Sequence, residues 1–356
     1  MTTIATSSVP MRAEAALASF QLELERSLAE LLVLPDEVGM DPRWARAMVE
    51  LRSYALRPAK RVRPTLLVTG WALASNELQR GVPEGVGAFA AGLELLHTFM
   101  LIHDDVADRA VTRRGGPALH RTLSDGRVGE DLAVVVGDYV YARAVEVMLS
   151  SGLPNAAAAT RYMMGICRHT AVGQYLDLDL ARTHLRDVTI FQTLKVANLK
   201  TARYGFVAPL VAGAMLGGAA QPLLDQLERV GRAAGLAFQL RDDLIGLFGD
   251  DAIAGKAGGG DFIEGKRTFP VLAAWTRADD AGRARLEQLW HGEARDAKAL
   301  EAARAEVTRW GGRDATQRLI DRSTRAARRV LEQLPSGSGA REGLDGLMAR
   351  MTRRAS

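Results

Sequence analysis

The spacing of apolar residues constrains the fold of this chain more than any other feature of its sequence. In residues 13–34, apolar side chains recur at the three- and four-residue intervals of an amphipathic helix. Similar spacing continues along most of the chain, and no segment alternates for long between apolar and polar residues, as a half-buried strand would. Hydrophobic residues make up 47% of the 356 residues, enough for a sizeable core. The sequence therefore predicts an all-α fold.

We expect one helical domain over residues 13–356, preceded by a disordered N-terminus at residues 1–12. A glycine-rich loop is expected at residues 249–264, and the helices of residues 279–356 lie beyond the motifs described below. The helices expected before that loop cover residues 13–34, 41–54, 60–74, 84–106, 130–150, 155–180, 186–216 and 221–248.

The helical segment at 84–106 runs into a cluster of three carboxylates, Asp104, Asp105 and Asp108. Residues four apart share a helix face, so Asp104 and Asp108 point the same way, and His97 lies two turns earlier on that face. Clustered carboxylates suit Mg²⁺, which binds carboxylates, water and substrate phosphates. The arginines that follow, Arg113 and Arg114, suit a phosphate group.

A second apolar segment ends in the paired carboxylates Asp242 and Asp243, with Gln239 one turn before Asp243. A pair of aspartates at a helix end is most often a solvated cap. However, carboxylates near a helix C-terminus oppose the macrodipole, at a cost of roughly 0.3–1 kcal/mol each, and here the pattern occurs twice. Two such clusters on long helices could face each other across a cavity and hold metal ions around a departing diphosphate.

These motifs and others between them resemble those of trans-isoprenyl diphosphate synthases, the polyprenyl synthetase family. The resemblance covers about residues 45–275, and the matching segments occur in the family's order. They are KRVRP at 60–64, DDVAD at 104–108, RRGGPALH at 113–120, GQYLDL at 173–178, LKTARY at 199–204, FQLRDD at 238–243, GK at 255–256 and EGKRT at 264–268.

The resemblance implies an isoprenoid synthase bundle with a central active-site cavity and about three Mg²⁺ ions, for which Mn²⁺ could substitute. The implied reaction is the head-to-tail condensation of isopentenyl diphosphate with dimethylallyl, geranyl or farnesyl diphosphate. The implied metal ligands are Asp104, Asp105, Asp108, Asp242 and Asp243. The implied ligands of the allylic diphosphate are Arg113, Lys200, Lys256 and Lys266. Those of isopentenyl diphosphate are Lys60, Arg63, His97 and Arg114. Thr201 and Gln239 would complete the catalytic set, with Asp177 supporting the metal shell.

In this family the residues four and five positions before the first aspartate often form the floor of the product pocket. Here they are Met100 and Phe99, and the bulk of Phe99 favours short products, C20 first and C15 next. The sequence departs from the family pattern at two places. Pro58 and Ala59 replace the two glycines before Lys60, and Gly246 replaces the last acid of the second aspartate motif, which predicts a weaker third metal site.

Two other functions remain open on the sequence alone. A class I terpene cyclase shares the helical fold and one acidic motif, but it would carry an Asn/Ser/Glu metal triad and would lack the isopentenyl site of Lys60 and Arg63. A non-catalytic subunit of a heteromeric synthase usually loses the first aspartate motif, which is intact here. A homodimer is expected from the resemblance.

Composition narrows the remaining function classes. The single cysteine, Cys167, cannot form an intramolecular disulfide, and the N-terminus lacks the pattern of a secretory signal, so we expect a cytoplasmic protein.

The net charge of +4 comes with arginines spread among acids, unlike the basic motifs of nucleic-acid-binding proteins. The longest uncharged segment, residues 204–222, is interrupted by Pro209; we expect a buried helix packed through small residues and no transmembrane segment.

Overall fold

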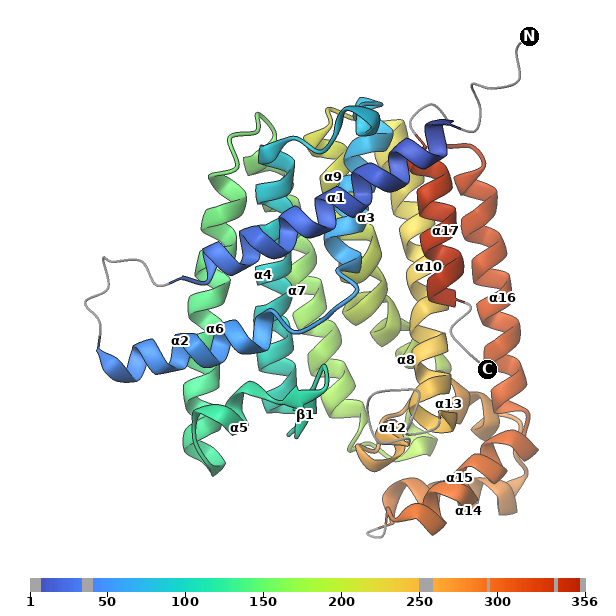
Figure 1. Ribbon diagram of the computed structural model, residues 1–356. Helices are drawn as coiled ribbons and strands as arrows, with labels where there is room; N and C mark the ends of the chain where they lie inside the picture. The colour runs from blue at the N-terminus through green and yellow to red at the C-terminus, as the bar shows by residue number, and fades with distance from the viewer. Residues whose placement is uncertain (1–7, 34–40, 250–258, 293–294, 336–338, 353–356) are drawn as a thin grey trace. The chain divides into compact units, whose positions relative to one another are not determined.

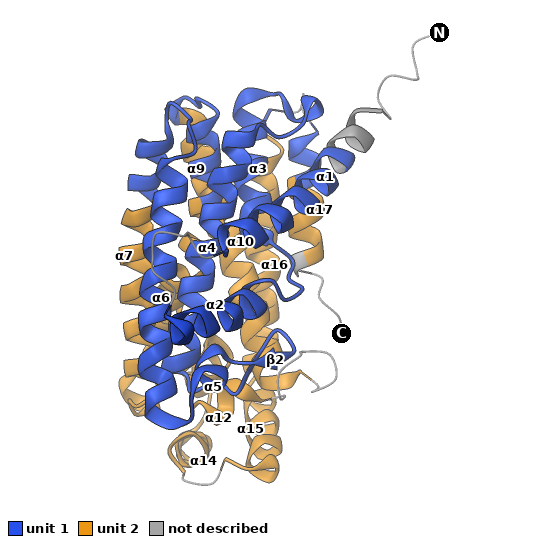
Figure 2. Ribbon diagram, turned by 60° about the vertical axis from the view of Figure 1, so that its left-hand side comes forward, with its two compact units in different colours: residues 1–162, 209–221, 335–343 blue, residues 163–208, 222–334, 344–356 orange. Residues whose placement is uncertain are grey.

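The computed structural model describes residues 8–33, 41–249, 259–292, 295–335 and 339–352 (Figure 1). It confirms the all-α prediction, because the strands of these residues are limited to one antiparallel hairpin, β1 (Thr112–Arg113) and β2 (Gly116–Pro117). The chain divides into two compact units (Figure 2). Unit 1 comprises residues 1–162, 209–221 and 335–343, and unit 2 comprises residues 163–208, 222–334 and 344–356.

Unit 1 is built on helices packed closely through glycine. A Cβ at Gly92 of α4 would lie 3.1 Å from the carbonyl oxygen of Ala144 in α6, and one at Gly213 of α9 would lie 2.8 Å from the carbonyl carbon of Leu67 in α3. The prediction of a buried, small-residue helix within 204–222 is therefore confirmed. The elements of this unit are α1 (Ser8–Leu31), α2 (Pro42–Ala55), α3 (Val62–Ser75), η1 (Leu78–Arg80), α4 (Glu84–Ala107), the hairpin, α5 (Leu119–Leu123), α6 (Gly126–Leu149), the start of α7 (Ala156–Leu180) and nearly all of α9 (Ala208–Leu216).

Unit 2 continues α7 and surrounds a core that includes Leu247, Phe262 and Trp290. The segment Ala197–Val207 is a π-helix (η3), a rare form that is frequent at functional sites. The other elements are η2 (Leu185–Asp187), α8 (Ile190–Val196), nearly all of α10 (Gln221–Phe248), α12 (Gly260–Ile263), α13 (Phe269–Trp275), α14 (Asp280–His291), α15 (Ala297–Arg309), α16 (Gly312–Leu331) and the larger part of α17 (Ala340–Thr352).

The structure differs from the expected boundaries in several places. Helix α1 begins at Ser8, so residues 8–12 are helical although we expected disorder there. The third helix begins at Val62 because Arg61 adopts a left-handed backbone with φ 43°. The helix expected over 186–216 is instead η2, α8, η3 and α9 in succession, and α12 occupies part of the expected glycine-rich loop.

Within the described ranges, α4 is the one helix long and apolar enough to cross a membrane. Of its most apolar window, 61% is buried inside the structure. Length and composition alone are weak evidence for a span, since the core helices of many globular proteins meet the same criteria.

Candidate active site

The first aspartate cluster lies at the C-terminal end of α4, where its members occupy different environments. Asp105 is fully buried: its Oδ2 accepts a hydrogen bond from the Tyr54 hydroxyl at 2.8 Å, and its Oδ1 accepts one from Arg113 Nε at 2.7 Å. Burial, and then the negative charge of Asp105, raises the pKa of Tyr54 well above its usual range, so Tyr54 remains a donor. Asp104 and Asp108, one turn apart, are partly exposed. The pair that shares a helix face is therefore the accessible one.

Basic residues gather beside this cluster. Arg113 Nη2 lies 3.7 Å from Asp104 Oδ2, and Arg114 occupies the hairpin turn with a left-handed φ of 51°. Arg57 holds the hairpin by donating from Nη1 to the carbonyl oxygens of Arg113 and Pro117, at 2.9 and 2.7 Å. The hairpin thus fixes two adjacent arginines next to the carboxylates.

His97 belongs to the same basic group. Arg63 Nη1 lies 3.0 Å from His97 Nε2 and, being a donor only, makes that nitrogen the acceptor. Burial, followed by the charges of Arg63, Arg114 and Arg113, lowers the pKa of His97 well below its ordinary value. A neutral imidazole among three guanidinium groups is a local concentration of positive charge that suits an anion such as diphosphate.

The KRVRP segment places its basic residues in unlike environments. Lys60 is exposed and Arg63 is half-buried. Arg61, which sequence reasoning did not select, is 4% exposed and forms ion pairs of 2.7 Å with both Glu25 and Glu94. Arg61 therefore anchors the start of α3, while Lys60 and Arg63 on either side remain the candidate ligands.

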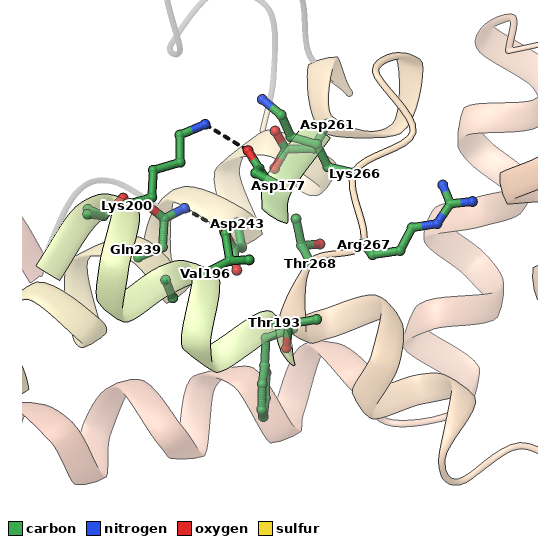
Figure 3. A pocket seen from close by; sticks show the side chains of 13 residues that line it. Asp177, Thr193, Val196, Lys200, Gln239, Asp243, Asp261, Lys266, Arg267 and Thr268 are labelled. Carbon is green, nitrogen blue, oxygen red and sulfur yellow. Dashed lines mark hydrogen bonds and ion pairs between the residues drawn. The ribbon is translucent and has the colours of Figure 1, made fainter. Parts of the chain in front are cut away.

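Asp243 of the second cluster lines a cavity of about 80 Å³ that opens to solvent in unit 2 (Figure 3). The cavity brings together six residues that the sequence selected: Asp177, Lys200, Thr201, Gln239, Asp243 and Lys266. Lys200 Nζ lies 2.7 Å from Asp177 Oδ2. A Cβ at Gly173 would lie 2.5 Å from the backbone nitrogen of Lys200, so only glycine allows α7 to approach the π-helix this closely.

Asp243 is the buried centre of this cavity. Gln239 Nε2 donates to its Oδ1 at 2.7 Å, and the Thr201 hydroxyl donates a short hydrogen bond to Gln239 Oε1. Burial, and then the negative charge of Asp261, raises the pKa of Asp243 to about 8, with smaller effects from Asp242 and Asp177. Neighbouring carboxylates repel one another when all are ionised, and a bound divalent cation would stabilise their ionised forms. Asp242 is half-buried and does not line the cavity.

Asp261 is a site residue that sequence reasoning missed. It lies in α12, lines the cavity, and its carboxylate sits against Gly246, where a Cβ would be only 2.5 Å from Asp261 Cγ. Asp261 thus occupies the space beside the position where the family's second motif carries its last acid. The signal in the sequence is the acid that follows three glycines at 258–260, within the loop we expected.

The remaining predicted residues are placed as follows. Lys266 pairs with Glu264 at 2.5 Å. Phe99 and Met100 are half-buried on α4, with the Phe99 ring centroid 5.1 Å from that of Tyr141. Lys256 lies outside the described residues. The two aspartate clusters belong to different units, and the expectation that they share one cavity stays a prediction.

Comparison with known proteins agrees with these motifs. The sequence profile of the polyprenyl synthetase family matches residues 45–307. The chain is 34% identical over 286 residues to a short chain isoprenyl diphosphate synthase of Methanothermobacter thermautotrophicus, covering 80% of this chain and 83% of that protein. It is 31% identical over 264 residues to a geranylgeranyl diphosphate synthase of Methanosarcina mazei, covering 73% and 75%.

Solved structures agree as well. The chain is similar to a geranylgeranyl pyrophosphate synthase of Corynebacterium glutamicum, determined with isoprenyl diphosphate and magnesium, with a TM-score of 0.81, 29% identity and 98% of each chain covered. It is also similar to a polyprenyl synthase of Caulobacter crescentus, with a TM-score of 0.82, 28% identity and 97% and 98% covered. The chain therefore belongs to the polyprenyl synthetase family and is a prenyltransferase of the short-chain trans-prenyl diphosphate synthase class.

Proposed function

We propose that this protein catalyses the Mg²⁺-dependent head-to-tail condensation of isopentenyl diphosphate with an allylic diphosphate, giving an all-trans C20 prenyl diphosphate, with C15 as the next candidate. The observation that carries this proposal is the cavity of unit 2, where buried Asp243 and half-buried Asp261 lie beside Lys200 and Lys266. Such a surface suits a metal-bound phosphate, because the carboxylates can bind the cation and the lysines can bind the phosphate oxygens.

The residues present fit Mg²⁺, which prefers hard oxygen ligands. Asp104 and Asp108 would hold metal on the accessible face of α4. Asp243 and Asp261, which line the cavity, would hold it there, with the neighbouring Asp242 as a third carboxylate. Asp105 would act mainly by orienting Arg113, since both of its oxygens accept hydrogen bonds. When bound, the ions would neutralise negative charge that develops on the departing diphosphate. The number of ions, about three, and replacement by Mn²⁺ belong to the same proposal.

The basic residues divide between two diphosphates in this proposal. Arg113, Lys200 and Lys266 would bind the allylic diphosphate, together with Lys256. The second diphosphate, that of isopentenyl diphosphate, would be bound by Lys60, Arg63, His97 and Arg114. The lowered pKa of His97 supports its role as a neutral hydrogen-bonding ligand among arginines that supply the charge.

The reaction needs no protein nucleophile. The allylic carbon–oxygen bond breaks, diphosphate leaves with the electron pair, and the double bond of isopentenyl diphosphate attacks the allylic cation. A proton is then lost to the released diphosphate, which restores a neutral carbon chain. Lys200 and Arg113 would hold the leaving group by charge-assisted hydrogen bonds, while Gln239, oriented by Thr201, fixes the Asp243 carboxyl.

Chain length in this proposal depends on Phe99 and Met100, one turn or slightly more before Asp104 on α4. The Phe99 ring packs against Tyr141 and against His103, with centroid distances of 5.1 and 4.6 Å. A ring held on two sides is a firm floor for a growing chain, which favours a short product. Replacing Phe99 with alanine should lengthen the product.

Two further expectations stay proposals. Helix α6 exposes Val128, Leu132 and Val135 at helical spacing, an apolar face that supports a homodimer. Light scattering after size-exclusion chromatography tests this, with Leu132→Glu expected to yield monomers. A cytoplasmic location is supported by the unpaired Cys167.

The decisive experiment is product analysis. Purified protein is incubated with Mg²⁺, isopentenyl diphosphate and each allylic diphosphate in turn, and the dephosphorylated products are separated by length. We expect a C20 or C15 alcohol, lost in Asp104→Asn and retained in Asp131→Asn, whose carboxylate is exposed on α6 and pairs with Arg127. Cyclic hydrocarbon without elongation would instead identify a terpene cyclase. No product with any primer would favour a non-catalytic subunit.

A further inference from the structure

A second group of metal-binding side chains lies in unit 2, apart from the aspartate motifs. It consists of His184, which precedes η2, and of Glu287 and His291 on α14. Their ligand atoms all lie within 4.8 Å of one another. Glu287 Oε1 is 2.5 Å from His184 Nδ1 and 3.5 Å from His291 Nε2. None of the three lines the cavity around Asp243.

The geometry of this group is close to that of a metal site. Glu287 and His291 are four residues apart and share one face of α14. Around a tetrahedral zinc ion, with bonds of about 2.0–2.2 Å, ligand atoms lie about 3.4 Å apart. The Glu287–His291 distance of 3.5 Å already matches, and His184, whose side chain is 47% exposed, needs to withdraw by about 1 Å. The two imidazoles are neighbours as well, with ring centroids 3.9 Å apart.

The surroundings orient the carboxylate. The backbone N–H of Leu185 donates to Glu287 Oε2 at 3.1 Å, which leaves Oε1 directed at the two histidines. This is the outer support that metal-ligating carboxylates commonly have. His184 Nδ1 and Glu287 Oε1 are within hydrogen-bonding distance, and a metal ion would take the place of the hydrogen between them.

Arg267 is the group that opposes a cation here. Its Nη2 donates to His291 Nε2 at 3.0 Å, so that nitrogen carries no hydrogen and its lone pair is taken by Arg267 until a metal replaces it. Arg267 keeps other acceptors if this contact is lost: the carbonyl oxygen of Thr183 at 2.7 and 3.0 Å, and that of Gly265. Metal binding therefore breaks one hydrogen bond of Arg267, and its bonds to the Thr183 and Gly265 carbonyl oxygens still hold the side chain in place.

The geometry points to a transition-metal site formed by His184, Glu287 and His291, with water completing the coordination of an ion of the Zn²⁺ class. Two imidazoles and one carboxylate favour Zn²⁺, Co²⁺ or Ni²⁺ over Mg²⁺, which prefers oxygen ligands. The site is separate from the proposed catalytic ions in position and in the metal it selects.

Cobalt binding tests this site directly. Full-length protein without a histidine tag is stripped with chelator, supplied with excess Mg²⁺ to occupy carboxylate sites, and titrated with Co²⁺ while its visible absorption is recorded. Ordered nitrogen coordination gives visible bands, which Zn²⁺ should then displace. We expect saturation near one equivalent. Binding should be roughly 100-fold weaker in His291→Gln and in Glu287→Gln, at least the upper end of the loss caused by removing an outer-sphere partner.

The variants are chosen to preserve the fold. Gln at 291 still offers Arg267 an acceptor, and Gln at 287 still offers one to Leu185. Matched controls are His169→Gln, a half-buried histidine elsewhere in unit 2, and Glu301→Gln, an exposed acid on α15; both should bind Co²⁺ as the wild type does. Equal binding by wild type and His291→Gln, or no saturable bands in wild type, would overturn the inference. The readout does not depend on prenyltransferase activity, so it stands or fails separately from the proposed function.

Discussion

The contact between Gly246 and Asp261 predicts an unexpected effect of restoring a side chain in the second aspartate motif. A Cβ at position 246 would lie 2.5 Å from Asp261 Cγ, whereas ordinary van der Waals contact begins at 3.4 Å. Gly246→Ala must therefore displace the Asp261 carboxylate by about 1 Å. Metal–ligand distances tolerate only about ±0.2 Å, so a carboxylate moved this far no longer serves an ion at its original place.

Gly246→Ala should change the Mg²⁺ dependence of activity more than the stability of the fold. The Mg²⁺ concentration that gives half-maximal activity should rise roughly 10-fold or more, the range found for lost support of a metal site. The free energy of unfolding should change little, because alanine in a helix is favoured over glycine by about 1 kcal/mol and this offsets the local crowding. Gly246→Asp, which restores the family's usual acid, should be worse, since it adds a like charge against Asp261.

The assay is a Mg²⁺ titration of the condensation rate, paired with urea unfolding. Gly165→Ala is the matched control: this glycine lies on α7 in the same unit, and a Cβ there would meet nothing within 4 Å. It should gain helix stability and keep its Mg²⁺ dependence. Unchanged Mg²⁺ dependence in Gly246→Ala, or higher activity in Gly246→Asp, would refute the reasoning.

Three further predictions concern buried ionisable groups. The pKa of Asp243 is about 8 in the folded protein and 3.8 ordinarily, so the folded state binds a proton that the unfolded state does not, and stability falls as pH rises between these values. From pH 6 to 8 the unfolding free energy of the metal-free wild type should fall by about 2 kcal/mol more than that of Asp243→Asn. Urea titration in the presence of a chelator measures this difference. Arg61→Met leaves Glu94 buried without its closest partner and should cost about 3–5 kcal/mol, while adding Glu94→Gln should recover part of that loss in the same titration. Burial raises the pKa of Cys167 to about 12, so a thiol-specific disulfide reagent at pH 8 should modify it only after denaturation; equal rates in folded and unfolded protein would contradict this.

The sequence predicted the local part of the site well, because helical spacing alone determines which side chains share a face. Asp104 and Asp108 lie on the accessible face of α4, as the four-residue interval indicates. The distinct environment of Asp105 could not be predicted in this way, since it depends on Tyr54, 51 residues earlier in the chain. Neighbouring aspartates in one motif thus differ through contacts that periodicity does not encode.

Loops account for most of what the sequence did not predict. Asp261 of α12 meets Gly246 of α10 through a tertiary contact that spacing along the sequence does not indicate. The motif alone therefore suggested a missing acid, although the structure has one nearby. Likewise, the left-handed backbone of Arg61 and the hairpin at Arg113 and Arg114 arise from tertiary contacts, the Glu94 ion pair and the Arg57 hydrogen bonds. These contacts override local preference, which gave no indication of either feature.

The order in which the two units use the chain has a consequence for synthesis on the ribosome. Unit 1 includes residues 335–343, which emerge after nearly all of unit 2 has been made, and unit 2 includes residues that follow position 343. Neither unit can be completed early in translation, and neither corresponds to a continuous gene fragment. Recombination that exchanges one unit between related genes would therefore interrupt both, so variation in this enzyme is expected to accumulate by point substitution and loop change within an undivided chain.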